Sequence, residues 1–109
     1  MNFNEKVWEM CKLIPSGKVS TYKEIGKKIG KGQVYRAVGN ALKRNPNAPK
    51  VPCHRVVCSD GSLGGYCGEM ESRKKIKLLE NEGIELFIVG KGKKKKIKIK
   101  DFEKKLWKF

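Results

Sequence analysis

The stretch KVSTYKEIGKKIGKGQVYRAVGNALKRNP, residues 18–46, decides the fold that we expect. Apolar residues recur at helical spacing on both sides of the glycine-rich turn at 30–32, which predicts two short helices joined by that turn. Ser20 or Thr21 can cap the first helix, with Glu24 as the partner in a capping box. An Asn-Pro pair ends the second helix.

Lysines and arginines are expected on the outer faces of these two helices. Two short basic helices around a glycine turn are typical of a helix-turn-helix, whose second helix enters a DNA groove. A basic helical hairpin also commonly covers a hydrophobic core, so both interpretations stay open at this point. The candidate DNA contacts are Thr21, Tyr35, Arg36, Ala37, Lys43 and Arg44.

Outside this region the pattern predicts two more helices and a C-terminal β-hairpin. Helical spacing continues over residues 3–14 and 70–83, while residues 84–89 and 95–100 have the pattern of strands around a GKGK turn. The segment VPCHRVV is also β-rich. We therefore expect a mainly α fold with small β elements, in which the final LWKF folds back on the core.

The net charge of +15 comes from 26 Lys+Arg against 11 Asp+Glu and is unevenly distributed. It is +8 over residues 1–50, −1 over 51–90 and +8 over 91–109. This excess predicts a polyanionic partner, with nucleic acid first and an anionic membrane second. We expect one domain at 1–90 with the Lys-rich extension 91–109 packed on it. A solvated strand edge and added DNA affinity are both open interpretations of the extension.

The chain has no apolar run close to the roughly 18 residues that a membrane span needs. Its N-terminus also lacks the layout of a signal peptide. We therefore expect a cytoplasmic protein, in which the four cysteines are not a disulfide framework. Cys11 lies on the apolar stripe of the first helix, which predicts a core residue.

The dipeptide Cys53-His54, within VPCHRVVCSDG, is the candidate reactive site. Zinc bound by Cys53, His54, Cys58 and Cys67 is disfavoured, because the spacing lacks the two paired clusters of structural zinc sites. A plain buried thiol stays open. A nucleophilic Cys53 needs a base and a carboxylate that orients the base, for which His54 and Glu82 are candidates. Neighbouring side chains on a strand diverge, so this contact needs a bend or a bridging water.

Five motifs together resemble the C-terminal, DNA-binding catalytic domain of the O6-alkylguanine-DNA alkyltransferases. They are STYKEIG, RAVGNALKRNP, PCHRVV, GGYCG and LLENEG. The resemblance implies a winged helix-turn-helix-like alkyltransferase domain without the extra N-terminal domain of many relatives. It also implies a monomer that moves an alkyl group irreversibly from a flipped guanine in double-stranded DNA to itself, with no cofactor and no metal.

The resemblance implies a role for each catalytic residue. Cys53 accepts the alkyl group from O6 of guanine, His54 is the base acting through a water, and Glu82 holds the histidine. Tyr22 offers its hydroxyl to ring N3 and helps the base to leave. Arg55 is interpreted as a structural ion-pair partner and not as a catalyst.

The resemblance also implies how the base is held. Arg36 fills the gap that the flipped base leaves in the stack. The backbone of Cys53 and Val56 accepts from the exocyclic amine, and Asn45 braces the turn before the active-site strand. The loop that closes over the base consists of Tyr66, Cys67 and Gly68.

Two other classes of function stay open. The first is a non-catalytic lesion-binding protein, like the alkyltransferase-like relatives that flip the base and recruit other repair factors. Those relatives characteristically lack the reactive cysteine, which this chain retains. The second is a winged-helix transcription regulator, which would show strong sequence preference in DNA binding.

Overall fold

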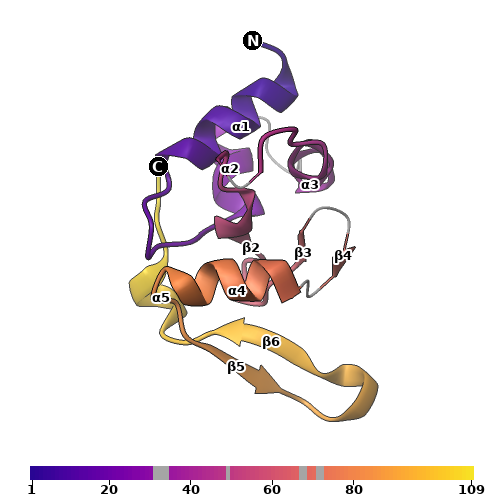
Figure 1. The fold of residues 1–109 in the computed structure, drawn as a ribbon. Helices are drawn as coiled ribbons and strands as arrows, with labels where there is room; N and C mark the ends of the chain where they lie inside the picture. The colour runs from indigo at the N-terminus through magenta and orange to yellow at the C-terminus, as the bar shows by residue number, and fades with distance from the viewer. Residues whose placement is uncertain (31–34, 49, 67–68, 71–72) are drawn as a thin grey trace.

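The computed structural model describes residues 1–30, 35–48, 50–66, 69–70 and 73–109. The helices are α1 (Phe3–Leu13), α2 (Tyr22–Ile29), α3 (Tyr35–Lys43), α4 (Arg73–Asn81) and α5 (Phe102–Lys105), with 3₁₀ turns η1 (Cys53–Arg55) and η2 (Gly92–Lys94). The strands are β1 (Ser20–Thr21), β2 (Val56–Val57), β3 (Gly65–Tyr66), β4 (Glu69–Met70), β5 (Leu86–Val89) and β6 (Lys96–Ile99). Figure 1 shows α1 to α3 gathered in one half of the molecule, with α4 between them and the β5–β6 hairpin. The predicted mainly α fold with small β elements is confirmed.

The first helix, α1, begins at a capping box. The Asn2 side chain accepts from the Glu5 amide at 2.8 Å, and the Glu5 carboxylate accepts from the Asn2 amide at 3.3 Å. Cys11 is fully buried on the inner stripe, so its predicted place in the core is confirmed. The Trp8 indole N–H donates to the carbonyl of Ala41 at 2.7 Å and thereby joins α1 to α3.

Helix α2 has the start and the end that the sequence predicts. The Thr21 hydroxyl accepts from the Glu24 amide at 3.0 Å. Gly30 ends the helix at φ +84°, a left-handed conformation that glycine adopts without a Cβ clash. The connection over residues 31–34 lies outside the described residues.

Two hydrophobic clusters form the core, and β2 contributes to both. The first cluster packs between the three N-terminal helices and contains Val7, Cys11, Ile14, Ile25, Val38, Ala41, Leu42, Val51, Cys53 and Val56. The second packs between α4 and the C-terminal hairpin and contains Val19, Val57, Leu63, Leu79, Ile84 and Ile99. Trp107 and Phe109 pack against the first cluster, so the predicted return of the final LWKF to the core is confirmed.

The prediction of a β-rich VPCHRVV segment is wrong for its first half. Cys53–Arg55 form the 3₁₀ turn η1, and only Val56–Val57 are extended. The Arg55 amide donates to the carbonyl of Pro52 at 3.0 Å, which closes the turn locally. Val56–Val57 then pair in parallel with Ser20–Thr21, a long-range contact that no local pattern predicts.

The predicted helix at 70–83 starts later than expected. Met70 belongs to β4 and pairs with Gly65 across the β3–β4 hairpin, and α4 begins only at Arg73. Its end is as predicted, since Gly83 follows the helix at φ +83° and its amide donates to Glu80 O at 3.0 Å.

The predicted C-terminal β-hairpin is confirmed as an antiparallel pair of β5 and β6. Its register places Leu86 opposite Ile99 and Ile88 opposite Ile97, which gives the hairpin one apolar face. The division expected between residues 90 and 91 falls between the two paired strands. Within the described ranges, no helix has the length and apolar character needed to cross a bilayer.

Candidate functional site

Cys53 begins η1 and is 4% exposed. Its amide donates to the carbonyl of Val51 at 2.8 Å, and Pro52 stands between them. In a 3₁₀ turn of three residues, successive side chains diverge by about 120° and do not point to opposite sides. The chain therefore bends at Cys53–Arg55 and does not run as an extended strand there.

His54 is 2% exposed, and its Nε2 lies 3.0 Å from Oε2 of Glu82. Burial lowers the pKa of His54 below its ordinary value of 6.5, although the hydrogen bond with Glu82 opposes this shift. A neutral imidazole carries one ring proton. With that proton on Nε2, the ring donates a hydrogen bond to the Glu82 carboxylate. Nδ1 is then the basic nitrogen of the ring.

Glu82 follows α4 and is ionised at neutral pH. Its burial acts to raise its pKa, but hydrogen bonds from Arg55 and His54 outweigh burial, and the pKa is lowered. Arg55 Nε donates to Oε1 at 2.9 Å, and Arg55 Nη2 donates to Oε2 at 2.6 Å. Arg55 Nη1 also donates to the carbonyl of Ile14 at 2.8 Å. The expected ion pair of Arg55 is thus present and ties the ends of α1 and α4 to η1.

Tyr22, the first residue of α2, places its hydroxyl against Gly64. A Cβ built on Gly64 would lie 2.9 Å from the Tyr22 oxygen and 3.2 Å from Sγ of Cys58, closer than side chains normally approach. Only glycine therefore permits this approach. Cys58 is half-buried and lies at this contact.

Lys75 is a site residue that the sequence analysis missed. It is fully buried, and its Nζ donates to the carbonyls of Val56 at 2.7 Å and Leu63 at 2.5 Å. Burial lowers its pKa to about 8, against the opposing effect of Cys58 and Cys53. The only sequence signal is its position four residues before Leu79, on the inner face of α4.

Asn45 and Val56 lie on either side of η1. The Asn45 side chain donates to the carbonyl of Val51 at 2.8 Å and accepts from the Asn47 amide at 3.0 Å, so it bridges the turn before Cys53. Val56 is fully buried, and its carbonyl is the one that accepts from Lys75.

Of the expected DNA contacts, Arg36, Lys43 and Arg44 are exposed on or just after α3, and Ala37 is half-buried there. Tyr35 is the first residue of α3, and its side chain is outside the described part. Thr21 is buried with its hydroxyl on the α2 cap, which makes its described contact structural.

Part of the expected loop over the base is not described. Tyr66 is placed by its backbone in β3, whereas Cys67 and Gly68 lie outside the described residues. Among the residues that are described, His, Cys, Asp and Glu side chains form no group of three that could hold a metal ion.

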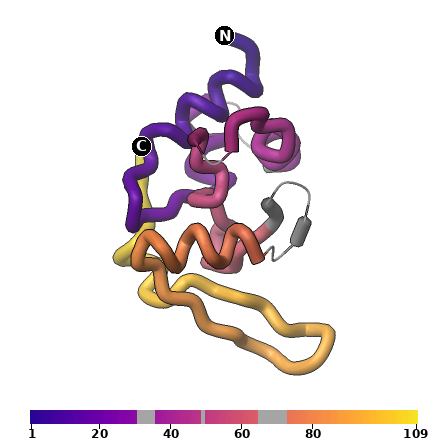
Figure 2. Tube along the Cα trace, in the orientation of Figure 1, coloured from indigo at the N-terminus to yellow at the C-terminus, as the bar shows by residue number. Residues whose placement is uncertain are grey.

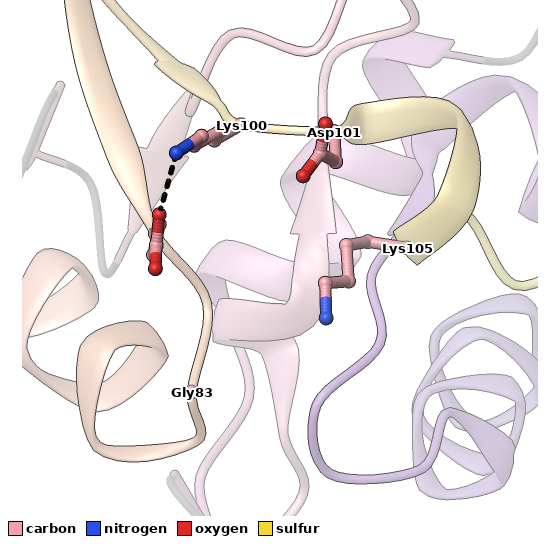
Figure 3. A pocket seen from close by; sticks show the side chains of 5 residues that line it. Gly83, Lys100, Asp101 and Lys105 are labelled. Carbon is pink, nitrogen blue, oxygen red and sulfur yellow. Dashed lines mark ion pairs between the residues drawn. The ribbon is translucent and has the colours of Figure 1, made fainter.

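A hollow near the C-terminal hairpin is separate from this site. Figure 3 shows its charged lining, in which Lys100 Nζ lies 3.1 Å from Glu85. The lining residues are Gly83, Glu85, Lys100, Asp101 and Lys105. None of them belongs to the expected reactive or DNA-contacting set.

These features define a class of protein, namely a small helical domain with a buried thiol beside a histidine-glutamate pair. The family described as 6-O-methylguanine DNA methyltransferase, DNA binding domain, matches residues 2–84, and the chain belongs to this family. A methylated-DNA--protein-cysteine methyltransferase of Methanosarcina barkeri is 45% identical over 83 residues, which are 76% of this chain and 52% of the relative. The Homo sapiens protein of that name is 37% identical over 86 residues, 79% of this chain and 41% of the relative. The chain thus spans about half the length of the curated relatives it matches.

Two solved structures extend the comparison. Mycobacterium tuberculosis OGT in complex with DNA has a TM-score of 0.69 and 43% identity, over 75% of this chain and 50% of that one. S. pombe Atl1, in complex with damaged DNA containing O6-carboxymethylguanine, has a TM-score of 0.82 and 32% identity. That match covers 97% of this chain and 94% of the other, so it extends past residue 84 into the C-terminal segment.

Proposed function

We propose that this chain repairs O6-alkylguanine in double-stranded DNA by transferring the alkyl group to Cys53 in a single turnover. The observation that supports this proposal most directly is the pairing of buried His54 with Glu82, directly after Cys53 in η1, in a member of this family. Since the alkylated sulfur is a stable thioether, each molecule acts once.

The proposed chemistry begins with the proton of the thiol. Ionised Glu82 fixes the Nε2–H tautomer of His54, and the lone pair of Nδ1 takes the Cys53 proton through a water. The thiolate then attacks the alkyl carbon, so that a sulfur–carbon bond forms as the carbon–O6 bond breaks. The electron pair passes into the guanine ring, and the Tyr22 hydroxyl donates to N3 and stabilises the departing base.

The proposed DNA contacts lie on and around α3. Arg36 fills the stack after the base has flipped, and Lys43 and Arg44 bind phosphates without reading sequence. The carbonyls of Cys53 and Val56 and the loop over 66–68 hold the base. We assign the activity to a monomer in the cytoplasm, where thiols stay reduced.

The proposal is tested by measuring the repaired base in the DNA. A duplex with one O6-methylguanine is incubated with equimolar protein, and the restored guanine is measured by nucleoside analysis. The wild-type chain and Cys58→Ala are expected to restore guanine, whereas Cys53→Ala is expected to restore none. Equal restoration by Cys53→Ala would remove the proposal.

A second candidate is lesion binding without transfer. The specific observation that favours it is the match to S. pombe Atl1 over nearly the whole chain. It predicts tight binding of the O6-methylguanine duplex with no loss of the methyl group from the DNA. The nucleoside analysis separates the two candidates, because only transfer restores guanine.

A further inference from the structure

The C-terminal segment after residue 84 is hydrogen-bonded to two separate parts of the candidate site. The family match ends at residue 84, and none of the residues expected at the site lies beyond it. Figure 2 shows this segment forming the hairpin below α4 and then returning beside the stretch that follows α1. One contact is made to residues 61–63, just before Gly64. The other is made to residues 19–20, just before Thr21 and Tyr22.

The first contact is made by β6. The Ile99 amide donates to the carbonyl of Gly61 at 2.9 Å, and the Leu63 amide donates to the carbonyl of Ile97 at 3.0 Å. With the isolated antiparallel bridge between Ser62 and Lys98, these bonds join residues 61–63 to β6. The segment that leads directly into Gly64 is therefore fixed by the hairpin.

Helix α5 adds packing to the same contact. A Cβ built on Gly61 would lie 3.1 to 3.4 Å from atoms of the Phe102 side chain, so the ring lies directly over this glycine. Gly61 has φ +86°, and its own backbone conformation also favours glycine. The position of residues 61–63 thus depends on Phe102 as well as on β6.

The second contact is made by the chain after α5. The Val19 amide donates to Lys105 O at 2.9 Å, and the Trp107 amide donates to Val19 O at 2.6 Å. The buried Ser20 hydroxyl donates to Trp107 O at 2.9 Å. These bonds fix the stretch that ends in Thr21 and delivers Tyr22 to the site.

The residues that follow these two stretches, Tyr22 and Gly64, lie against each other at the candidate site. The Tyr22 hydroxyl and the Gly64 backbone lie too close together for a Cβ to fit between them. Each is one or two residues from a stretch that the C-terminal segment holds. The separation between Tyr22 and the loop after Leu63 is therefore set from outside the part of the chain that matches the family.

We propose that residues 96–107 are a clamp that positions the pocket for the alkylated base, by holding Tyr22 and Gly64 at a fixed separation. The clamp rests on the proposed function, because it positions groups expected to contact the base. The hydrogen bonds described between it and the two stretches go to Lys18, Val19, Ser20, Gly61 and Leu63. Loosening it is expected to impair use of the lesion while the thiol stays reactive.

The test uses Phe102→Ala, with Phe102→Leu as the conservative rescue and Phe87→Ala as the matched control in the same hairpin region. Phe87 is 43% exposed and pairs opposite Lys98. Ser20→Ala, with Ser20→Thr as its rescue, loosens the other contact with a smaller loss of packing. All variants are assayed below their measured unfolding temperatures.

Three rates or ratios are compared: methyl transfer from a saturating O6-methylguanine duplex, iodoacetamide alkylation of Cys53, and the preference for lesion-containing over undamaged duplex. Phe102→Ala and Ser20→Ala are expected to lower transfer by about 10-fold or more, since small misplacements of reacting groups are costly. They should also lower the lesion preference, while iodoacetamide alkylation changes by less than about 2-fold. Phe102→Leu and Ser20→Thr should recover most of the loss, and Phe87→Ala should behave like the wild type.

Wild-type transfer and wild-type lesion preference in both folded clamp variants would overturn the clamp. An equal loss of iodoacetamide alkylation would also overturn it, because the defect would then lie in the thiol or the fold. Absence of transfer by the wild-type chain would instead contradict the proposed function. In that case the clamp is still tested by how strongly each variant prefers lesion-containing over undamaged duplex. A lower preference in Phe102→Ala and Ser20→Ala would support the clamp, and an unchanged preference would overturn it.

Discussion

In the proposed mechanism, the proton state of His54 and Glu82 determines when Cys53 can react. Burial lowers the pKa of His54 from 6.5, and hydrogen bonds from Arg55 and His54 lower the pKa of Glu82 from 4.5. The imidazole of His54 therefore stays neutral down to a pH below 6.5. The carboxylate of Glu82 stays ionised down to a pH below 4.5. The proposed mechanism therefore loses transfer only when falling pH passes the lowered pKa of His54.

We therefore predict a transfer rate that stays constant from neutral pH down to below 6.5 and then falls. Glu82→Gln is expected to lower the plateau by about 10- to 100-fold, because the amide no longer fixes the tautomer of His54. Single-turnover rates measured across pH 5 to 8 check both points. An acid limb centred above 6.5, or an unchanged plateau in Glu82→Gln, would exclude His54 as the base that acts through this pair.

The three candidate reactive residues could be proposed from the sequence, while Lys75 shows what the sequence cannot reveal. The side chains of Cys53, His54 and Glu82 can all take part in catalysis, so they are candidates before their place in the fold is known. Lys75 lies in a lysine-rich helix, where a lysine ordinarily faces water. Only the carbonyls of Val56 and Leu63, distant in sequence, make its burial favourable.

At the scale of elements, the helices were predictable because their signals are local. Capping residues, glycine ends and apolar spacing fixed α1 and α2 to within a residue or two. The η1 turn was not predictable, since PCHRVV has the composition of a strand and only Val56–Val57 find a partner. The start of α4 was missed because Met70, at the head of the helical pattern, instead pairs with Gly65 in the β3–β4 hairpin.

Thr21 provides a test at this scale, because it was expected both to cap α2 and to touch DNA, and its described contact is the cap. Thr21→Ala is expected to lower the free energy of unfolding by about 1 kcal/mol, the usual loss for an N-cap hydroxyl. Affinity for undamaged duplex should change by less than about 2-fold, since the side chain is buried. Denaturant melts and a binding titration measure the two quantities, and Thr21→Ser should restore the stability. A large loss of affinity without loss of stability would mean that the hydroxyl contacts DNA.

Helix α3 provides the second test, through Arg36 and Lys43. If Arg36 fills the stack, Arg36→Ala should lower transfer by about 10-fold or more while affinity for undamaged duplex falls by less than about 3-fold. Lys43→Ala is the control, since loss of a phosphate contact should affect affinity for damaged and undamaged duplex alike. Equal effects of Arg36→Ala on transfer and on undamaged affinity would make it only a phosphate contact.

At the scale of the whole molecule, the net charge is unevenly distributed along the chain. The N-terminal 50 residues and the last 19 each have a net charge of +8, whereas the part that contains Cys53 and Glu82 is close to neutral. Such an arrangement suits an uncharged base held between surfaces that bind its phosphates.

The charge distribution predicts strong salt dependence. With about six phosphate contacts, affinity for undamaged duplex should fall on the order of 10³-fold between about 50 and 200 mM salt. Fluorescence anisotropy with two unrelated duplexes measures the slope and, at the same time, any sequence preference. A flat response, or strong preference for one duplex, would contradict a sequence-independent basic surface.

The central claim is that one alkyl group moves to Cys53 and stays there. Its most direct test is the intact mass of the protein after reaction with excess O6-methylguanine duplex, followed by mapping of the modified peptide. We predict a single increment of about 14 Da, one methyl group in place of the thiol hydrogen, located at Cys53 and not exceeded with more DNA or time. An unchanged mass, or an increment that persists in Cys53→Ala, would contradict the account.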